Sequence, residues 1–202
     1  MSNSNNFSFV LQDSLWEDPK LLLFVKLLKV WSQQTNLISA HDLKGDFMRR
    51  HIKDCGGLLP FVQGWPSLVD IGTGAGLPGI VLSILANKHV HLVESRLKKV
   101  LFLKEAKCTL DLNVTVHHGR LEEMSPFQTP FFVSRAFRSL EDTLQLLRPH
   151  LTKETVYVCL KGESAMDEVA KARVHFAFDL EVFSSLTHAG GKVLRLHHIE
   201  PK

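Results

Sequence analysis

The sequence lacks most features that mark secreted, membrane-spanning or metal-binding proteins. Its three cysteines, Cys55, Cys108 and Cys159, cannot all pair within the chain, and they show no C-x-x-C or zinc-binding spacing. We therefore expect a reducing, cytoplasmic environment and no structural metal. Residues 1–9 contain no basic region followed by an apolar core, so no signal peptide is predicted. The most apolar run, residues 21–30, is interrupted by lysines and is too short to span a bilayer.

Charge, repeats and metal-ligand motifs are also sparse. The net charge of +3 permits a nucleic-acid partner without establishing one. The histidines form no H-x-x-x-H motif, so we predict no metal site. The adjacent pairs His117–His118 and His197–His198 are expected to point to opposite faces of their strands. The 202 residues, 45% of them hydrophobic, suffice for one domain with a full-sized core, and no internal repeat divides them.

One stretch, residues 67–80, carries a strong local pattern. A short apolar run that ends in Asp70 predicts a buried strand, and a glycine-rich turn follows it directly. The apolar residues from Ile80 onward predict a helix, with Pro78 near its first turn, where a missing N–H does no harm. Strand, glycine turn and helix start together are typical of the adenosine-cofactor cradle in doubly wound α/β folds.

The glycine spacing leaves two cofactor classes open. Gly72, Gly74 and Gly76 give G-x-G-x-G, which suits S-adenosylmethionine (SAM), whereas Gly74, Gly76 and Gly79 give G-x-G-x-x-G, which suits a dinucleotide. Because glycine has no Cβ, a ligand can lie against the backbone N–H groups. Asp70 can accept a hydrogen bond either from a ligand or from an amide of the turn.

A second acid supports a cofactor role for the turn. Residues 89–94 form another mostly apolar run, and it ends in Glu94. Glu94 follows Asp70 at close to the ~20-residue offset at which a carboxylate meets ribose hydroxyls. We therefore expect Glu94 to bind ribose rather than to be a solvated loop residue.

The remaining patterns predict alternating helices and strands. We expect helices at residues 19–34, from 42 or 46 to 59, and at 80–86, 96–110, 140–147 and 163–172, and strands at 67–70, 89–94, 112–117, 131–136, 155–160, 175–183 and 192–197. The last two strands are joined without a long helix, which predicts an antiparallel hairpin. SAM-dependent methyltransferases of the doubly wound class end in this way, whereas nucleotide-binding oxidoreductases usually do not.

These elements predict an α/β fold with a doubly wound, mostly parallel seven-stranded sheet, as in Rossmann-like class I SAM-dependent methyltransferases. We place this domain at residues 61–202 and an N-terminal helical extension, packed on the core, at residues 1–60. The helix at residues 19–34 is apolar over most of its surface, which indicates that it packs against the main domain.

Polar residues are expected where open α/β sheets bind ligands, at the carboxyl ends of the strands. Arg135 ends the fourth strand and Lys161 ends the fifth. Leu121 and Glu122 follow the third strand, where a cofactor's adenine often lies, although Glu122 is equally consistent with an exposed acid at a helix start.

A charged helical segment that contains Arg50 and His51 precedes the glycine turn. It is consistent either with a solvated face or with a basic edge of the cleft that holds phosphate.

Residues 69–80 closely resemble the signature of the RsmG/GidB methyltransferases of bacterial small-subunit ribosomal RNA. The ending Leu77-Pro78-Gly79 is more specific than the glycines alone. Other segments resemble family motifs in the same order, namely Trp31 with Asn36-Leu37, and residues 50–55, 96–102, 120–123, 134–137 and 160–162. The resemblance covers about residues 20–163. Ser32 and Cys55 depart from the family pattern, and Glu94 stands where many members carry aspartate.

The resemblance implies transfer of a methyl group from SAM to N7 of a guanine in 16S rRNA, within the small ribosomal subunit or its precursor. It also implies that Gly72, Leu77, Leu121, Glu122 and Arg135 contact the cofactor. The remaining glycines shape the turn.

Guanine N7 carries a lone pair and no proton, so we expect catalysis by in-line positioning without a general base. Arg135, Lys161, Arg50 and His51 are the candidates for holding RNA phosphate or the guanine O6 edge. We expect a monomer without a membrane partner. The alternatives are a SAM-dependent methyltransferase acting on a small molecule or protein, an NAD-binding oxidoreductase, and a non-enzymatic RNA-binding module.

Overall fold

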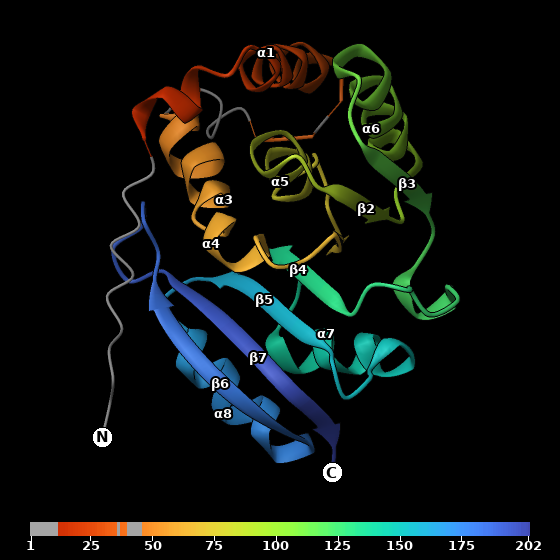
Figure 1. Ribbon diagram of the computed structural model, residues 1–202, viewed down its shortest axis with the longest axis vertical. Helices are drawn as coiled ribbons and strands as arrows, with labels where there is room; N and C mark the ends of the chain where they lie inside the picture. The colour runs from red at the N-terminus through yellow and green to blue at the C-terminus, as the bar shows by residue number, and fades with distance from the viewer. Residues whose placement is uncertain (1–11, 36, 40–45) are drawn as a thin grey trace.

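The computed structural model describes residues 12–35, 37–39 and 46–202. Seven strands form one sheet in the order β3-β2-β1-β4-β5-β7-β6 (Figure 1). The strands are β1 (Ser67–Ile71), β2 (His89–Glu94), β3 (Val114–His118), β4 (Phe131–Arg135), β5 (Val156–Lys161), β6 (Phe176–Ser184) and β7 (Lys192–Pro201). The first five strands are parallel, and β7 is antiparallel to both β5 and β6. The expected α/β fold and its C-terminal antiparallel hairpin are confirmed.

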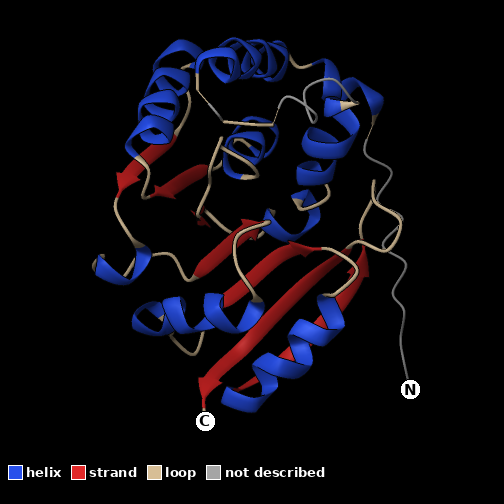
Figure 2. Cartoon of the chain, turned by 180° about the vertical axis from the view of Figure 1, so that it is seen from behind, coloured by secondary structure: helices blue, strands red, loops and turns tan. Residues whose placement is uncertain are grey.

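Helices cover both faces of the sheet. They are α1 (Pro19–Gln34), the π-helical η2 (Met48–Lys53), α3 (Asp54–Gly56), α4 (Leu59–Val62), α5 (Gly79–Ala86), α6 (Leu97–Leu110), α7 (Leu140–Leu147) and α8 (Ala165–His175), with short 3-10 turns η1 (Asp13–Glu17), η3 (Leu121–Glu123) and η4 (Arg148–His150). Helices α1 and α3 to α6 pack on one face, and α7 and α8 pack on the other (Figures 1 and 2). Strand residues alternate between the two cores: Leu68 belongs to the first and Val69 to the second.

The predicted boundaries hold best where the sequence signals are local. Helices α1 and α7 and strand β2 have the predicted ends. The predicted helix up to residue 59 is confirmed over residues 48–56, where η2 continues directly into α3, but its first part is π-helical and it ends at Gly56. The separate helix α4 begins at Leu59. Residues 40–45, where that helix was expected to begin, lie outside the described residues. Helix α8 begins at Ala165 and ends at His175, later than expected at both ends.

Helix α1 packs on the first core through one apolar face. Asp18 caps it by accepting from the N–H groups of Lys20 and Leu21, and Phe24 and Leu28 are fully buried. Burial of each such side chain contributes roughly 1.5–3 kcal/mol. The Trp31 indole donates to the Glu105 carboxylate of α6 at 2.9 Å. The helix is therefore joined to the main core, as its apolar surface indicated. Nothing among the described helices has the length and apolar character needed to cross a bilayer.

One expectation about the histidines is wrong. His197 and His198 do not point to opposite faces of β7, because their Nδ1 atoms lie 3.1 Å apart. The pairing register between β6 and β7 shifts at this point, and His198 adopts a left-handed conformation with φ of +50°. This bulge turns the second side chain back toward the first.

The parallel strands all end at one edge of the sheet. Gly72, Glu94 and Arg135 follow or end β1, β2 and β4 there. Loops that join strands to helices at this edge therefore place residues from distant parts of the sequence next to one another.

Candidate active site

The glycine turn is built around the buried carboxylate of Asp70. Its Oδ2 accepts from the hydroxyl of Thr73 at 2.5 Å and from the N–H of Gly79 at 2.7 Å. A Cβ at Gly79 would lie 2.6 Å from that same oxygen and 2.3 Å from Leu92, so only glycine allows the approach. Burial raises the pKa of the Asp70 carboxyl to about 7. Of the two roles left open by the sequence, the structure shows the one in which Asp70 accepts from the turn.

The turn also depends on a close approach at Gly72. This residue has φ of +62°, and a Cβ there would lie 2.2 Å from the ring of Phe137. The ring therefore lies directly against the bare backbone. Phe137 follows β4, so this contact joins the glycine turn to the segment that leaves the central strand.

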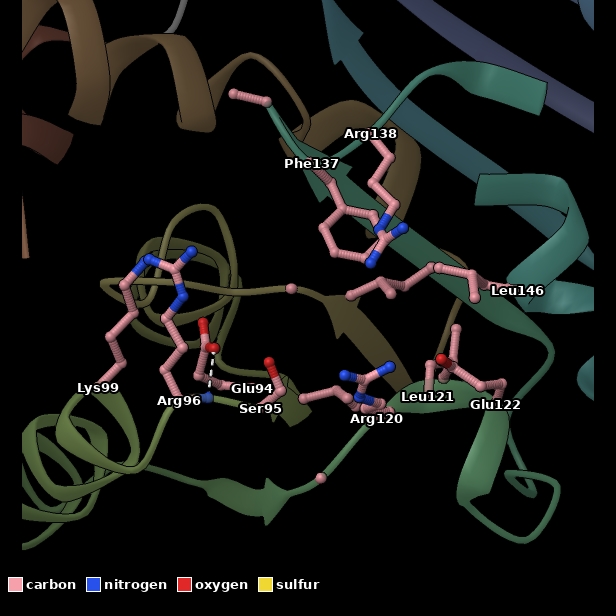
Figure 3. Close-up of a pocket in the computed structure, with 15 residues that line it drawn as sticks. Glu94, Ser95, Arg96, Lys99, Arg120, Leu121, Glu122, Phe137, Arg138 and Leu146 are labelled. Atoms are coloured by element: carbon pink, nitrogen blue, oxygen red, sulfur yellow. Dashed lines mark hydrogen bonds between the residues drawn. The ribbon is translucent and has the colours of Figure 1, made fainter. Parts of the chain in front are cut away.

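A cavity of about 360 Å³ opens beside the turn (Figure 3). Gly72 and Glu94 line it from the ends of β1 and β2, and Leu121 and Glu122 line it from η3. Figure 3 shows Phe137 and Arg138 above the cavity, with Lys99 and Arg96 on one side and Glu122 on the other. The cavity thus combines the buried carboxylate of Glu94 with backbone, apolar and basic groups.

Glu94 is held in place by two backbone amides. Its Oε1 accepts from the N–H of Arg96 at 2.8 Å, and its Oε2 accepts from the N–H of Gly74 at 3.1 Å. Only 6% of the Glu94 surface is exposed to solvent. A carboxylate has about four acceptor positions, so the two amides leave capacity for hydroxyl donors of a ligand.

The predicted cofactor residues divide into two groups. Gly72, Glu94, Leu121 and Glu122 line the cavity together. The others lie elsewhere: Asp70 and Leu77 are buried, Gly74 and Gly76 belong to the turn, and Arg135 lines two neighbouring hollows.

A second hollow, of about 290 Å³, adjoins the first. Ala136, Phe137 and Arg138 line both, so this segment is a wall shared between them. A third hollow, of about 470 Å³, continues from the second and shares Asp54 and Arg135 with it. The three hollows form a series along the carboxyl edge of the sheet.

Arg135 is the central side chain of the second and third hollows. Its guanidinium donates to the Asp54 carboxylate at 3.2 Å, to the Arg50 carbonyl at 3.2 Å and to His51 Nδ1 at 3.0 Å. A guanidinium has no acceptor, so His51 Nδ1 accepts and its ring proton resides on Nε2. The structure therefore brings together three of the four predicted RNA-positioning residues.

Lys161, the fourth, lies in the second hollow with its ammonium group engaged. It donates to the Arg138 carbonyl and forms an ion pair of 2.7 Å with Glu168 of α8. Only 7% of its side chain is exposed. These contacts fix the Arg138 backbone, and with it the shared wall.

Asp54 accepts hydrogen bonds from three side chains of this region, although the sequence did not single it out. Its second oxygen accepts from the hydroxyls of Ser185 at 2.9 Å and Thr187 at 3.0 Å, both on the loop between β6 and β7. The sequence held no signal for this contact, because the partners are more than a hundred positions apart. Asp54 lies in the segment 50–55 that resembles a family motif, but this resemblance did not indicate its partner.

The buried thiols near this site are not nucleophiles. Cys55 follows Asp54, and Cys159 lies on β5. Burial raises the pKa of each thiol to about 12, so both are protonated at neutral pH.

Comparisons with known proteins show what this chain is similar to. Residues 17–197 match the GidB family model, described as rRNA small subunit methyltransferase G. The chain is 36% identical over 181 residues to the ribosomal RNA small subunit methyltransferase G of Granulibacter bethesdensis, covering 89% of this chain and 84% of that protein. It is 35% identical to the protein of the same name from Paramagnetospirillum magneticum, covering 89% and 88%.

Solved structures share the fold at low sequence identity. The crystal structure of M. jannaschii TYW2 in complex with AdoMet has a TM-score of 0.58 at 14% identity, covering 79% of this chain and 80% of that one. The ribosomal protein L11 methylase from Lactobacillus delbrueckii subsp. bulgaricus has a TM-score of 0.58 at 16% identity, covering 78% and 80%. At these identities the similarity shows a shared fold and no more.

Proposed function

Because this chain belongs to the GidB family of rRNA small subunit methyltransferases, we propose that it methylates 16S rRNA with SAM, at N7 of a guanine. The observation that carries the proposal is the wall formed by Ala136, Phe137 and Arg138. On one side of it lies a cavity suited to an adenosine cofactor, and on the other lies a hollow that contains Arg135. A methyl donor and an acceptor base bound in these two hollows meet at that wall.

The first cavity fits the adenosine part of SAM. Glu94 keeps acceptor capacity for the ribose hydroxyls beyond its two backbone amides, and Gly72 lines the same cavity. Leu121 and Glu122 lie across the cavity, where the adenine would bind. The bound donor would supply an electrophilic sulfonium methyl group. The role of this chain is to orient that methyl group toward the second hollow.

The second and third hollows suit an RNA substrate. Five basic residues line these hollows against three acids. The basic residues are Arg49, Arg50, Arg135, Arg138 and Lys161, and the acids are Asp46, Asp54 and Glu168. Arginine is well matched to phosphate and to the O6 and N7 edge of guanine. Three hydrogen bonds fix the guanidinium of Arg135, so it would bind the base in a defined orientation.

Two of the three acids and one of the two histidines that line these hollows are already engaged by basic side chains, which is consistent with N7 as the acceptor. The carboxylates of Asp54 and Glu168 accept from Arg135 and Lys161, and His51 Nδ1 accepts from Arg135. A nitrogen lone pair needs no proton removed, so alignment of the two reactants accounts for the acceleration. We further propose that the protein acts as a cytoplasmic monomer on the small subunit or its precursor.

Deletion of the gene provides the test. N7-methylguanine is mapped in 16S rRNA from the deletion strain and from its parent, and small subunits from both are incubated with purified protein and labelled SAM. We expect one mark to be missing in the deletion strain and to be restored in vitro. Retention of every such mark, or methyl transfer to a metabolite or protein that ribonuclease leaves unchanged, would contradict the proposal.

A further inference from the structure

A cluster of three metal-ligating side chains lies on the C-terminal hairpin, away from the site described above. Asp179 is on β6, and His197 and His198 are adjacent on β7. His197 pairs with Val156, the first residue of β5. The cluster therefore lies near the edge of the sheet opposite to the one where the cofactor cavity opens.

The backbone is bent in a way that brings the two histidines together. Asp179 pairs with His197 and Ala177 pairs with Glu200, so β7 carries one more residue than β6 between these pairs. His198 has φ of +50°, a conformation that costs a non-glycine residue free energy. In a regular strand the two rings would point to opposite faces, but here both reach Asp179.

Three potential ligand atoms converge at this bulge. His198 Nδ1 lies 2.8 Å from Asp179 Oδ2, His197 Nδ1 lies 3.1 Å from His198 Nδ1, and His197 Nδ1 lies 3.6 Å from Asp179 Oδ2. A tetrahedral ion with bonds of ~2.0–2.1 Å requires ligand atoms about 3.3 Å apart. An ion placed about 0.9 Å above the plane of these three atoms would lie about 2.05 Å from each, a normal zinc-ligand distance.

Protons satisfy this arrangement poorly. His198 Nδ1 bears the proton that it donates to Asp179, so it cannot also accept from His197 Nδ1. When unprotonated, the Nδ1 atoms of the two imidazoles and the Asp179 oxygen can each accept a hydrogen bond. Only one proton is available to these three atoms. A cation in the same position would be bound by a lone pair from each atom.

A second carboxylate, that of Glu181, lies near the ring of His197. Its Nε2 lies 3.6 Å from Glu181 Oε1, and that oxygen accepts from Arg195 at 2.9 Å. Ligating histidines generally direct the nitrogen that does not bind metal toward a carboxylate. The arrangement favours a proton on Nε2 and leaves Nδ1 for the cation.

We propose that Asp179, His197 and His198 bind one divalent transition-metal ion of the Zn²⁺ class, with solvent in the fourth position. Two imidazoles and one carboxylate are ligands that Zn²⁺ accepts readily. Side-chain exposures of 64% for Asp179 and 68% for His198 give an ion direct access. Because its ligands come from both strands, the bound ion crosslinks β6 to β7 and stabilises the folded state by mass action. Histidine spacing alone did not predict this site, because Asp179 reaches it only through strand pairing.

The test is a titration of the untagged, metal-stripped full chain with Zn²⁺ against a chromophoric chelator. We expect one Zn²⁺ per chain in the wild type and at least ten-fold weaker binding in His198→Gln and in Asp179→Asn. The matched control is His175→Gln, since His175 is also an exposed histidine beside a carboxylate, 3.3 Å from Glu141. Its affinity should equal that of the wild type.

Thermal unfolding provides a second measurement. Zn²⁺ should raise the Tm of the wild type and of the control, and should leave the Tm of His198→Gln unchanged. Equal Tm values without metal would show that the variants remain folded. Absence of stoichiometric binding in the wild type, or equal binding in all four proteins, would overturn the proposal.

Discussion

The Asp54 carboxylate and the Arg135 guanidinium form an ion pair of 3.2 Å, although 81 positions separate the two residues in the chain. Only 12% of the Asp54 side chain and 18% of the Arg135 side chain are exposed. The same carboxylate also accepts from two hydroxyls of the loop between β6 and β7. One buried acid therefore fixes both the proposed RNA-binding arginine and the loop beside it.

Replacement of Asp54 tests this arrangement. In Asp54→Asn the side chain loses its charge and its match to Arg135, so we expect rRNA methylation to fall at least ten-fold while SAM affinity changes less than two-fold. Loss of hydrogen bonds to a charged group should also cost about 1.5–3 kcal/mol of stability. Methylation rates, SAM titration and urea unfolding provide the three measurements.

The control for that variant is Glu141→Gln, which removes the partly exposed contact with His175. Exposed pairs contribute only about 0–1 kcal/mol, so its stability and methylation rate should stay close to those of the wild type. Normal rRNA methylation by Asp54→Asn would rule out a positioning role for this carboxylate.

Replacement of Glu94 tests the cofactor cavity. Glu94→Gln removes the negative charge and replaces one carboxylate oxygen by an NH2 group, which then faces the N–H of Gly74 or Arg96; a single oxygen remains to accept hydrogen bonds. We expect SAM to bind at least ten-fold more weakly, equivalent to about 1.4 kcal/mol. Calorimetric titration measures the affinity. Glu123→Gln, an exposed acid of η3, is the control, and equal affinities in the two variants would argue against the assigned ribose site.

A methyl group at Gly72 tests the contact between the turn and the shared wall. In Gly72→Ala the new Cβ meets the Phe137 ring and the backbone has positive φ, so the ring must move. We expect a loss of about 1–2 kcal/mol in stability and weaker binding of SAM. The control is Gly64→Ala, where nothing lies within 4 Å of the added atom. Denaturant unfolding of both variants measures the difference, and equal stabilities would contradict the predicted clash.

The buried carboxyl of Asp70 should make stability depend on pH. Burial raises its pKa from the ordinary value of 3.8 to about 7 in the folded protein, so the folded chain binds more protons than the unfolded chain between these values. Stability therefore falls as pH rises from about 4 to about 7 and levels off above that range. Asp70→Asn removes this contribution. The unfolding free energy of the wild type minus that of the variant, measured at several pH values, should fall as the pH rises through this range. Parallel curves would show that Asp70 does not titrate in this range.

Local sequence patterns sufficed to predict most of the fold. Glycines at 72, 74 and 76 were recognisable because positive φ is accessible to them at little cost, and the structure gives all three positive φ. Helix α7 ends as predicted because Pro149 follows it. The helix type at residues 48–53 was less predictable, since a π-helical turn has no distinctive residue spacing.

The amino-acid sequence by itself determined the glycine turn, the acids Asp70 in β1 and Glu94 at the end of β2, and the order of helices and strands, because each depends on residues close together in the chain. Only the tertiary structure decided that Asp54 holds Arg135 and that a bulge brings His197 beside His198. Both depend on how segments far apart in sequence pair in space. Strand register and loop packing are set by the free energy of the whole core, which no local pattern specifies.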